Sequence, residues 1–424
     1  MQNIPPAAAA PARAAWVPIE QVGPRILLHT PEFAKDPHAA YREMRKEKYG
    51  SLVPVELAPG VPATLVIGYH TARRILTDPE HFPADPRGWQ DTIPADSPVK
   101  PMLEWRPNAL RSAGLAHARY RGANTGGLDG VDPHRLRDQV IATTTPLINK
   151  FCRAGKADVI VDYARPLCFS VMNTMLGCTD DVGNDVAWAL ARMFDSTTDT
   201  DKVNQVLVQA LGGHIADKRA HPGDDITTRL LAHHSRLSDE ELINQLVTLY
   251  AAGIEPMVNL ITNTVLLMVT EDRFLTSRES FGTPIKDAIG EILVKDPPIT
   301  NLCLSYPPQP IVVDGIWLPA HQPVVISMAA CNNDPTVNNT DQFFEADWHL
   351  AFGAGPHACF PSAQVLARMI AHTAIERLLD ALPDLVPARP KEQLIWRPGP
   401  FHRALAAFPV VFNPAPPLPI EGHR

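Results

Sequence analysis

The longest apolar stretch of the chain follows a polar segment at residues 237–241. Ser238 is suited to cap a helix, and Glu241 lies three residues later, which together form a capping-box pattern. From Leu242 to about Val269, apolar residues occupy nearly every face that a helix would present. Helices of this kind are buried on all sides. The pattern therefore predicts one long helix through the middle of the molecule.

Elsewhere the pattern alternates between helical and strand periods. Residues 36–49 are amphipathic, with Asp36 as a cap and Pro37 at the first helical position, and they predict a helix. Short apolar and β-branched runs predict strands at Leu52–Leu57, Thr64–Ile67 and Pro323–Ala329, and a hairpin within Ile311–Leu318. Further helices are predicted over 70–76, 133–153, 157–177, 182–195, 202–219, 225–232 and 363–382. The predicted fold class is mostly α with small β-sheets.

Charge and cysteine content narrow the class of protein. The 424 residues carry 38 Lys plus Arg against 46 Asp plus Glu, a net charge of −8, which argues against nucleic acid as a partner. The six cysteines form no C-x-x-C pair, and most lie among apolar residues. We interpret them as reduced thiols of a cytosolic protein.

The N-terminal residues are rich in Ala and Pro. We therefore expect a flexible arm over residues 1–24 and a single catalytic domain over residues 25–424. The start of the chain lacks a signal-peptide pattern, and no uninterrupted run of about 18 apolar residues indicates a membrane span. We expect a cytoplasmic enzyme with no membrane partner.

One segment late in the chain suits a metal-binding cysteine. Residues 352–359 read Phe-Gly-Ala-Gly-Pro-His-Ala-Cys and precede a predicted helix. Gly353 and Gly355 allow tight backbone turns, and amides near a helix N-terminus favour a thiolate at Cys359. A thiolate held in this way is suited to ligate haem iron. The alternative is a buried free cysteine after a Gly-rich turn.

Two further patterns suit a flat, negatively charged cofactor. Ala251, Ala252 and Gly253 are consecutive small residues in the long apolar helix, where a planar porphyrin could approach the backbone. His117 and Arg121 lie four residues apart and share one helix face. Two positive groups on one face suit an anion such as a haem propionate, although a solvated basic face has the same spacing.

These motifs resemble those of the cytochrome P450 family, whose cysteine loop has the form F-G-x-G-x-H-x-C-x-G. The matching residues are Phe352, Gly353, Gly355, His357 and Cys359. The resemblance extends from about Asp36 to Phe412. It implies the cytochrome P450 fold, with haem b held between the long central helix and the cysteine loop.

The resemblance also implies roles for individual residues. Cys359 would be the axial metal ligand. The remaining contacts to haem would come from His117, Arg121, Ala252, Phe352, Gly353 and His357. Pro361 stands where the family has glycine, and we expect the following helix to begin about two residues later than in the family.

The central helix departs from the family at one chemically important position. The family pattern A/G-G-x-E/D-T-T is matched by Gly253 and Glu255, but Pro256 replaces the threonine that manages water and protons. Proline has no N–H for the carbonyl of Ala252. We hypothesise that this carbonyl and Glu255 hold a water in place of the hydroxyl, which makes Gly253, Glu255 and Pro256 the candidate catalytic residues. The alternative is that oxygen activation has been lost.

Two basic residues of the family are also absent. In the E-x-x-R motif Glu291 is present, but Val294 replaces the arginine. Glu291 must then protonate, turn outward or find another base, for which Lys295 is a partial candidate. Ser305 replaces an arginine that binds propionate in the family. The remaining candidates for that role are His117, Arg121 and His357.

We therefore expect a haem-thiolate monooxygenase that oxidises a small organic substrate, in secondary metabolism, with electrons from a ferredoxin-type partner that docks near Arg368. One alternative is peroxide-driven oxidation or phenolic coupling at the same haem. Another is a catalytically impaired relative that acts as a binding partner.

The long loop at residues 78–112 is expected to roof the substrate pocket. The candidates for either pocket lining or core packing are Trp89, Met102, Leu103, Trp105 and Phe401.

Overall fold

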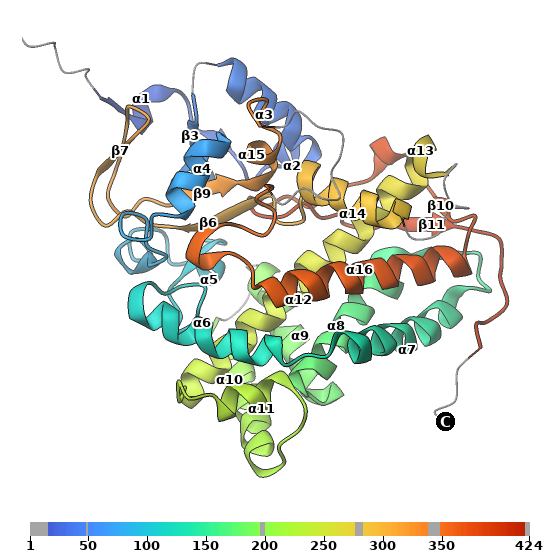
Figure 1. The fold of residues 1–424 in the computed structure, drawn as a ribbon. Coiled ribbons are helices and arrows are strands. Elements are labelled where there is room, and N and C mark those ends of the chain that lie inside the picture. Colours follow the sequence, from blue (N-terminus) through green and yellow to red (C-terminus); the bar gives the residue numbers. More distant parts are fainter. Residues whose placement is uncertain (1–15, 48–49, 196–199, 276–282, 338–347, 420–424) are drawn as a thin grey trace, which may run out of the picture.

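The computed structural model describes residues 16–419, apart from 48–49, 196–199, 276–282 and 338–347. In this part of the chain helices predominate and the strands form three small sheets, which confirms the predicted fold class. In Figure 1 the largest sheet and the N-terminal helices occupy the upper left, and the longer helices fill the lower part of the molecule.

The central element is α12 (Asp239–Thr270), as predicted from the apolar stretch. The N–H of Ser238 donates to the Glu241 carboxylate at 2.8 Å, and the N–H of Glu241 donates to Ser238 Oγ at 3.3 Å, so the capping box is formed. Among the described residues α12 is the one helix long and apolar enough to cross a membrane, but 72% of its most apolar 18-residue stretch is buried inside the protein. It is therefore a core helix.

The other helices enclose α12. It packs against α8 (Arg165–Leu176), α10 (Thr200–Ala220), α14 (Thr283–Lys295) and α16 (Pro361–Ala381). The remaining helices of this part are α6 (Gly114–Asp129), α7 (Pro133–Phe151), the π-helical turn η2 (Val159–Ala164), α9 (Asp180–Asp195), α11 (Ile226–Ala232) and α13 (Asp272–Leu275). Gly177 ends α8 with φ 69°, a left-handed conformation that glycine adopts without strain.

The largest sheet has the strand order β2-β3-β4-β9-β6. Its strands are β2 (Ile26–Leu27), β3 (Leu52–Ala58), β4 (Val61–Val66), β6 (Asn301–Ser305) and β9 (Val324–Ser327). β3 pairs antiparallel with β4, and β9 lies parallel to β4 but antiparallel to β6. The associated short helices are α1 (Ile19–Val22), α2 (Pro31–Lys35), α3 (Pro37–Lys46), α4 (Tyr69–Leu76) and α15 (Met328–Asn332).

Two three-stranded sheets complete the fold. One contains β1 (Val17–Pro18), β7 (Ile311–Val313) and β8 (Ile316–Leu318), and the other β5 (Lys156–Asp158), β10 (Val386–Pro387) and β11 (Pro409–Val411). Between β7 and β8 the φ angles of Asp314 and Gly315 are 50° and 79°, which is the conformation that a two-residue hairpin requires. The predicted hairpin is confirmed.

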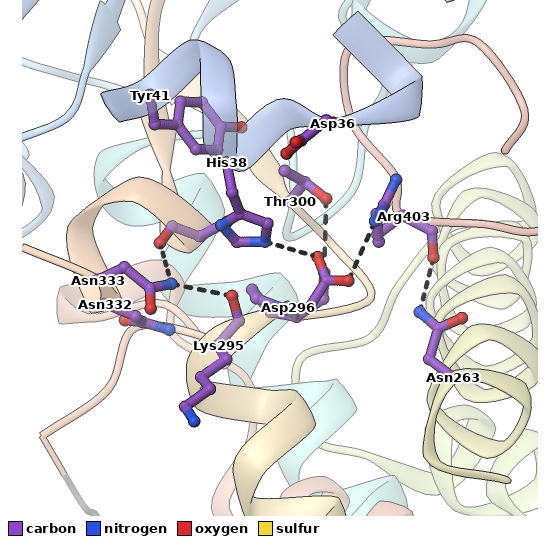
Figure 2. Close-up of polar contacts among 12 residues, drawn as sticks. Asp36, His38, Tyr41, Asn263, Lys295, Asp296, Thr300, Asn332, Asn333 and Arg403 are labelled. Carbon is purple, nitrogen blue, oxygen red and sulfur yellow. Dashed lines mark hydrogen bonds and ion pairs between the residues drawn. The ribbon is translucent and has the colours of Figure 1, made fainter. Parts of the chain in front are cut away.

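A polar cluster at the end of α14 fixes the C-terminal segment next to α12 (Figure 2). Asp296 accepts hydrogen bonds from His38 Nε2 at 3.2 Å and from Arg403 Nε at 3.0 Å. The backbone carbonyl of Arg403 in turn accepts from Asn263 Nδ2 of α12 at 2.9 Å. Burial would raise the pKa of Asp296, but the Arg403 cation and His38 lower it below its ordinary value. The cluster thereby ties α3, α14, α12 and the C-terminal segment together.

One expectation about the N-terminal arm is corrected. Residues 1–15 lie outside the described residues, but the expected flexible arm is structured from Trp16 onward, because Ile19 is buried and Val17 pairs with Ile316. Near the other end, the segment from Ile395 to Arg403 forms only single bridges, because its proline and glycine residues interrupt the ladder.

Candidate active site

The cysteine segment forms a tight loop just before α16. The N–H of Cys359 donates to the carbonyl of Phe352 at 2.7 Å. Gly353 and Gly355 have φ angles of 72° and 68°, and a Cβ at Gly355 would collide with the backbone carbonyl of Leu76. Gly355 therefore requires glycine for both conformation and space, and Gly353 for conformation.

The helix after this loop begins earlier than expected. Pro361 is the first residue of α16, two residues after Cys359, so the predicted start at Ala363 was wrong. Proline is favoured at the first helical position because its N–H would be unpaired there and its φ is already helical. Pro361 is therefore compatible with an early start of α16.

The thiol of Cys359 is half-buried and its protonation is controlled by burial. Burial raises the pKa of Cys359 to about 11, although the Arg121 cation and the N–H of Phe360 oppose this. The N–H of Phe360 lowers the pKa, as expected for an amide near a helix N-terminus, but burial outweighs it. A bound metal cation would reverse the balance, because a thiol deprotonates when it coordinates a metal.

The centre of α12 opens onto a cavity of about 590 Å³. Ala252 is exposed in the middle of this otherwise buried helix, and it lines the cavity together with Ala251, Glu255 and Pro256. The cavity has the size of a small-molecule site. The helix continues through Pro256 to Thr270.

Gly253, predicted to be catalytic, faces another way. It is absent from the cavity wall, and a Cβ there would lie 2.5 Å from the sulfur of Met172 on α8. The glycine therefore allows α8 and α12 to pack closely. This close packing gives Gly253 a structural role.

The long loop contributes to the cavity as predicted, but only in part. Met102 and Leu103 line the cavity, and so does Phe401 from the C-terminal segment. Trp89 is instead buried in the core, with its ring 5.6 Å from that of Tyr306. The ring of Trp105 lies beneath the guanidinium of Arg87.

Glu255 has a partner that the sequence did not reveal. Its carboxylate forms an ion pair with Arg397 of the C-terminal segment, and both residues line the cavity. His402 lies on the same wall, where burial and the Arg397 cation lower its pKa to about 4 despite the Glu255 charge. Its Nε2 has no hydrogen-bond partner among the described residues. No short-range pattern indicated this cluster, because Arg397 lies 142 residues after Glu255.

The rings of His117 and His357, two of the residues expected to contact haem, lie together. Their ring centroids are 4.0 Å apart, and His357 Nε2 forms a hydrogen bond with the carbonyl of Ser112 at 3.0 Å. Burial and the adjacent positive groups lower the pKa of His117 to about 4. His117 Nε2 and Ser112 Oγ are buried without a partner among the described residues.

Two arginines pack against aromatic rings of the cysteine loop. The guanidinium of Arg121 lies 4.1 Å from the ring centroid of Phe360, directly after Cys359. Arg368 of α16 lies over the ring of Phe352 and bonds to His349. Arg368 is thus half-buried against the loop.

Two basic residues pair with Glu291, which is one of the three outcomes that the sequence left open. Arg273 and Lys295 form ion pairs with it at 2.7 and 3.1 Å. Burial would raise the pKa of Glu291, but these two cations lower it below its ordinary value. Val294 is fully buried against Trp348. It therefore makes an apolar contact at the position where the resemblance led us to expect an arginine.

Each of the two cations that pair with Glu291 is expected to compensate for loss of the other. We predict that Arg273→Ala and Lys295→Ala each destabilise the fold by about 1 kcal/mol, because one partner remains. The double variant is expected to lose about 3–5 kcal/mol, because the Glu291 charge is then buried alone. Urea unfolding measures these losses. Adding Glu291→Gln to the double variant should recover part of the loss, and no recovery would contradict the charge argument.

The described residues fit a haem. Cys359 offers a half-buried sulfur, and Ala252 leaves the backbone of α12 open to a flat group. At one edge, Arg111 Nε, Ser112 Oγ and His117 Nε2 are buried polar atoms without partners among the described residues. Such atoms need hydrogen-bond partners, which carboxylates would supply.

Comparisons with known proteins agree with this geometry. The chain is 29% identical to cytochrome P450 107B1 of Saccharopolyspora erythraea over 91% of this chain and 98% of that protein. It is 28% identical to the cytochrome P450 monooxygenase PikC of Streptomyces venezuelae, over 89% and 92%. Among solved structures, CYP154C4 from Streptomyces sp. W2061 matches with a TM-score of 0.80 and 27% identity, over 92% and 98%. No family model matches the chain.

The fold and these relatives define the class as haem-dependent oxidoreductases of the cytochrome P450 type. The chain has the cytochrome P450 fold, and over about nine-tenths of its length it is a homologue of the bacterial cytochrome P450 monooxygenases.

Proposed function

We propose that this protein is a haem-thiolate monooxygenase that oxidises a small organic substrate, with Cys359 as the metal ligand. Two observations carry the proposal: Cys359 lies half-buried in a tight loop before α16, and Ala252 is exposed on a core helix that lines a cavity. When bound, haem with a thiolate ligand supplies oxygen activation. The relatives described as monooxygenases support this activity.

The residues of the chain would position the substrate and handle protons. Leu103, Leu302 and Phe401 form apolar parts of the cavity wall, and apolar walls exclude water from the reacting centre. Pro256 has no hydroxyl, but the neighbouring Glu255 presents a carboxylate to the cavity. Its ion pair with Arg397 holds the carboxylate toward the C-terminal segment. A water on the free carbonyl of Ala252 would complete the proton path, as hypothesised from the sequence.

Electrons would come from a separate ferredoxin-type protein. Leu115 at the start of α6 and Val365 on α16 are large apolar residues with exposed fractions of 91% and 60%, and each lies close in sequence to a residue of the proposed haem site. They are suited to a protein contact near the cysteine loop, to which Arg368 could add a charge. One solved relative, P450BioI, is in complex with an acyl carrier protein that carries a fatty acid, and it matches this chain at 25% identity with a TM-score of 0.75. We place the protein in the cytoplasm, in secondary metabolism.

Peroxide-driven oxidation is the second candidate function. It is favoured by the absence of a hydroxyl at Pro256 and by the engagement of Glu255 with Arg397. Both features weaken proton delivery to oxygen, whereas peroxide carries its own protons. The same cavity and the same Cys359 would serve this reaction.

The absorption spectrum of the reduced protein with carbon monoxide tests haem-thiolate ligation. We expect the Soret band at the long wavelength of a thiolate complex, because Cys359 would be the axial ligand. Cys359→His should shift this band to the shorter wavelength of a nitrogen ligand, while Cys331→Ser, at a fully buried cysteine elsewhere, should not. A colourless protein after reconstitution with hemin would instead support the binding-partner alternative.

A further inference from the structure

One edge of the proposed haem site has no cation at Ser305, where the resemblance led us to expect an arginine. It has a different cation, Arg111, to which the sequence pattern assigned no role. Ser305 at the end of β6 is buried and carries no charge. Arg111, from the segment between α5 (Lys100–Leu103) and α6, reaches the same strand. Its Nη1 donates to the carbonyl of Cys303 at 2.6 Å, two residues before Ser305.

Arg111 is held rigidly by its surroundings. Its Nη2 donates to the carbonyl of Met102 at 2.8 Å, and its backbone N–H donates to Asn108 Oδ1 at 2.9 Å. The residue is only 5% exposed. The guanidinium is therefore fixed in one place and direction.

The positive charge of Arg111 has no anionic partner in the described part of the chain. None of the ion pairs there includes Arg111, and its Nε has no hydrogen-bond partner. An isolated buried cation is costly, and buried polar atoms are almost always hydrogen-bonded. The Nε donor and the uncompensated charge of Arg111 are therefore available to an external anion.

The neighbours of Arg111 show what kind of anion fits. Ser112 is next in sequence and binds His357 through its carbonyl, and the ring of His357 lies against that of His117. Ser112 Oγ and His117 Nε2 are buried without partners among the described residues. A guanidinium beside a hydroxyl and an imidazole suits a carboxylate that can accept several hydrogen bonds.

We propose that Arg111 binds a haem propionate in place of the arginine that Ser305 replaces, with Ser112 and His117 donating to the same carboxylate edge. This inference rests on the proposed haem-binding function. It assigns a binding role to the loop before α6 and explains how the chain retains haem without a basic residue on β6.

The test compares haem with haem dimethyl ester, whose carboxylates carry no charge. For each group, the rate of loss from the protein is measured by transfer to excess apomyoglobin. We expect the wild-type protein to lose haem about 10- to 100-fold more slowly than the ester, the range of one hydrogen bond to a charged group. Arg111→Gln should remove most of this preference, and adding Ser305→Arg to that variant should restore it. The control Arg87→Gln, at an arginine paired with Asp85 on the same long loop, should keep the wild-type preference.

The outcomes separate this proposal from the one on which it rests. If Arg111→Gln speeds the loss of haem and of the ester equally, Arg111 is a structural residue and the inference is wrong. If the preference is unchanged in Arg111→Gln, the propionates bind elsewhere and the inference is also wrong. If the wild-type protein binds neither group, the proposed function itself fails.

Discussion

Replacing Asp296 by alanine is expected to lower the free energy of unfolding by about 3–5 kcal/mol. The reason is the position of Arg403, which is 9% exposed and bonded to Asp296 Oδ2 at 3.0 Å. Without Asp296 its cation would be buried and unpaired. The loss is measured by urea or guanidinium unfolding of the wild type and the variant. Asp239→Ala, which removes the exposed partner of Arg219, is the matched control and should cost no more than about 1 kcal/mol.

The pH dependence gives a second check on the same pair. The folded state lowers the pKa of Asp296 below its ordinary value of 3.8. The stabilisation is therefore present above pH 3.8 and disappears as the pH falls through the lower folded value. The wild type and Asp296→Ala should converge in stability at acid pH. A constant difference at every pH would mean that the variant acts through lost packing and not through lost charge.

His402 adds an acid sensitivity of its own. Its folded pKa of about 4 lies below its ordinary 6.5, so between these values the unfolded state binds the proton and the folded state does not. This contribution to stability is lost as the pH falls from about 6.5 to 4. It should be the same in the wild type and in Asp296→Ala, which separates it from the Asp296 effect.

The Asp296 cluster also matters for the site. Arg403 is anchored by Asp296, and six residues earlier in the same segment Arg397 reaches Glu255 of α12. Phe401 lies between them and lines the cavity. Loosening this anchor would move one wall of the cavity. Stability and site geometry are therefore coupled through the C-terminal segment.

Local patterns predicted the elements that rest on local interactions. The Ser238–Glu241 capping box, the Asp314-Gly315 turn and the continuous apolar stretch of α12 each depend on residues within one segment. Such signals are present in the sequence itself. The start of α16 was misplaced because Pro361 was treated as a departure from the family, although proline is favourable at that helical position.

The parts of the site that were missed depend on contacts between distant segments. Arg397 meets Glu255, and Arg111 meets the carbonyl of Cys303 across 192 residues. Arg273 of the short helix α13 reaches Glu291. An arginine has no local pattern that identifies its partner, because its long side chain can reach several elements. The resemblance signalled a missing base near Glu291 and near Ser305, but it gave no sign of the Arg397 partner of Glu255.

Replacing Glu255 by glutamine is expected to separate the two candidate functions. Glu255 is the carboxylate that α12 presents to the cavity beside Pro256, and glutamine keeps its shape but cannot carry a proton. With electrons from a ferredoxin and its reductase, turnover of a substrate found by a spin-state screen should fall about 10²- to 10⁴-fold, the range for one acid–base group. With hydrogen peroxide as oxidant it should fall less than about tenfold, because peroxide brings its own protons.

The controls make each outcome of this experiment decisive. Glu271→Gln removes a carboxylate paired with Lys391 directly after the C-terminal end of α12, away from the cavity, and should leave both reactions unchanged. An equal fall with both oxidants would show that Glu255 only holds Arg397 in place. No fall with either would show that Glu255 does not deliver protons in the reaction.

Pro256→Thr tests the water on the Ala252 carbonyl, because it restores both a hydroxyl and a helical N–H at that position. Peroxide release per turnover should then change, and an unchanged value would exclude the water.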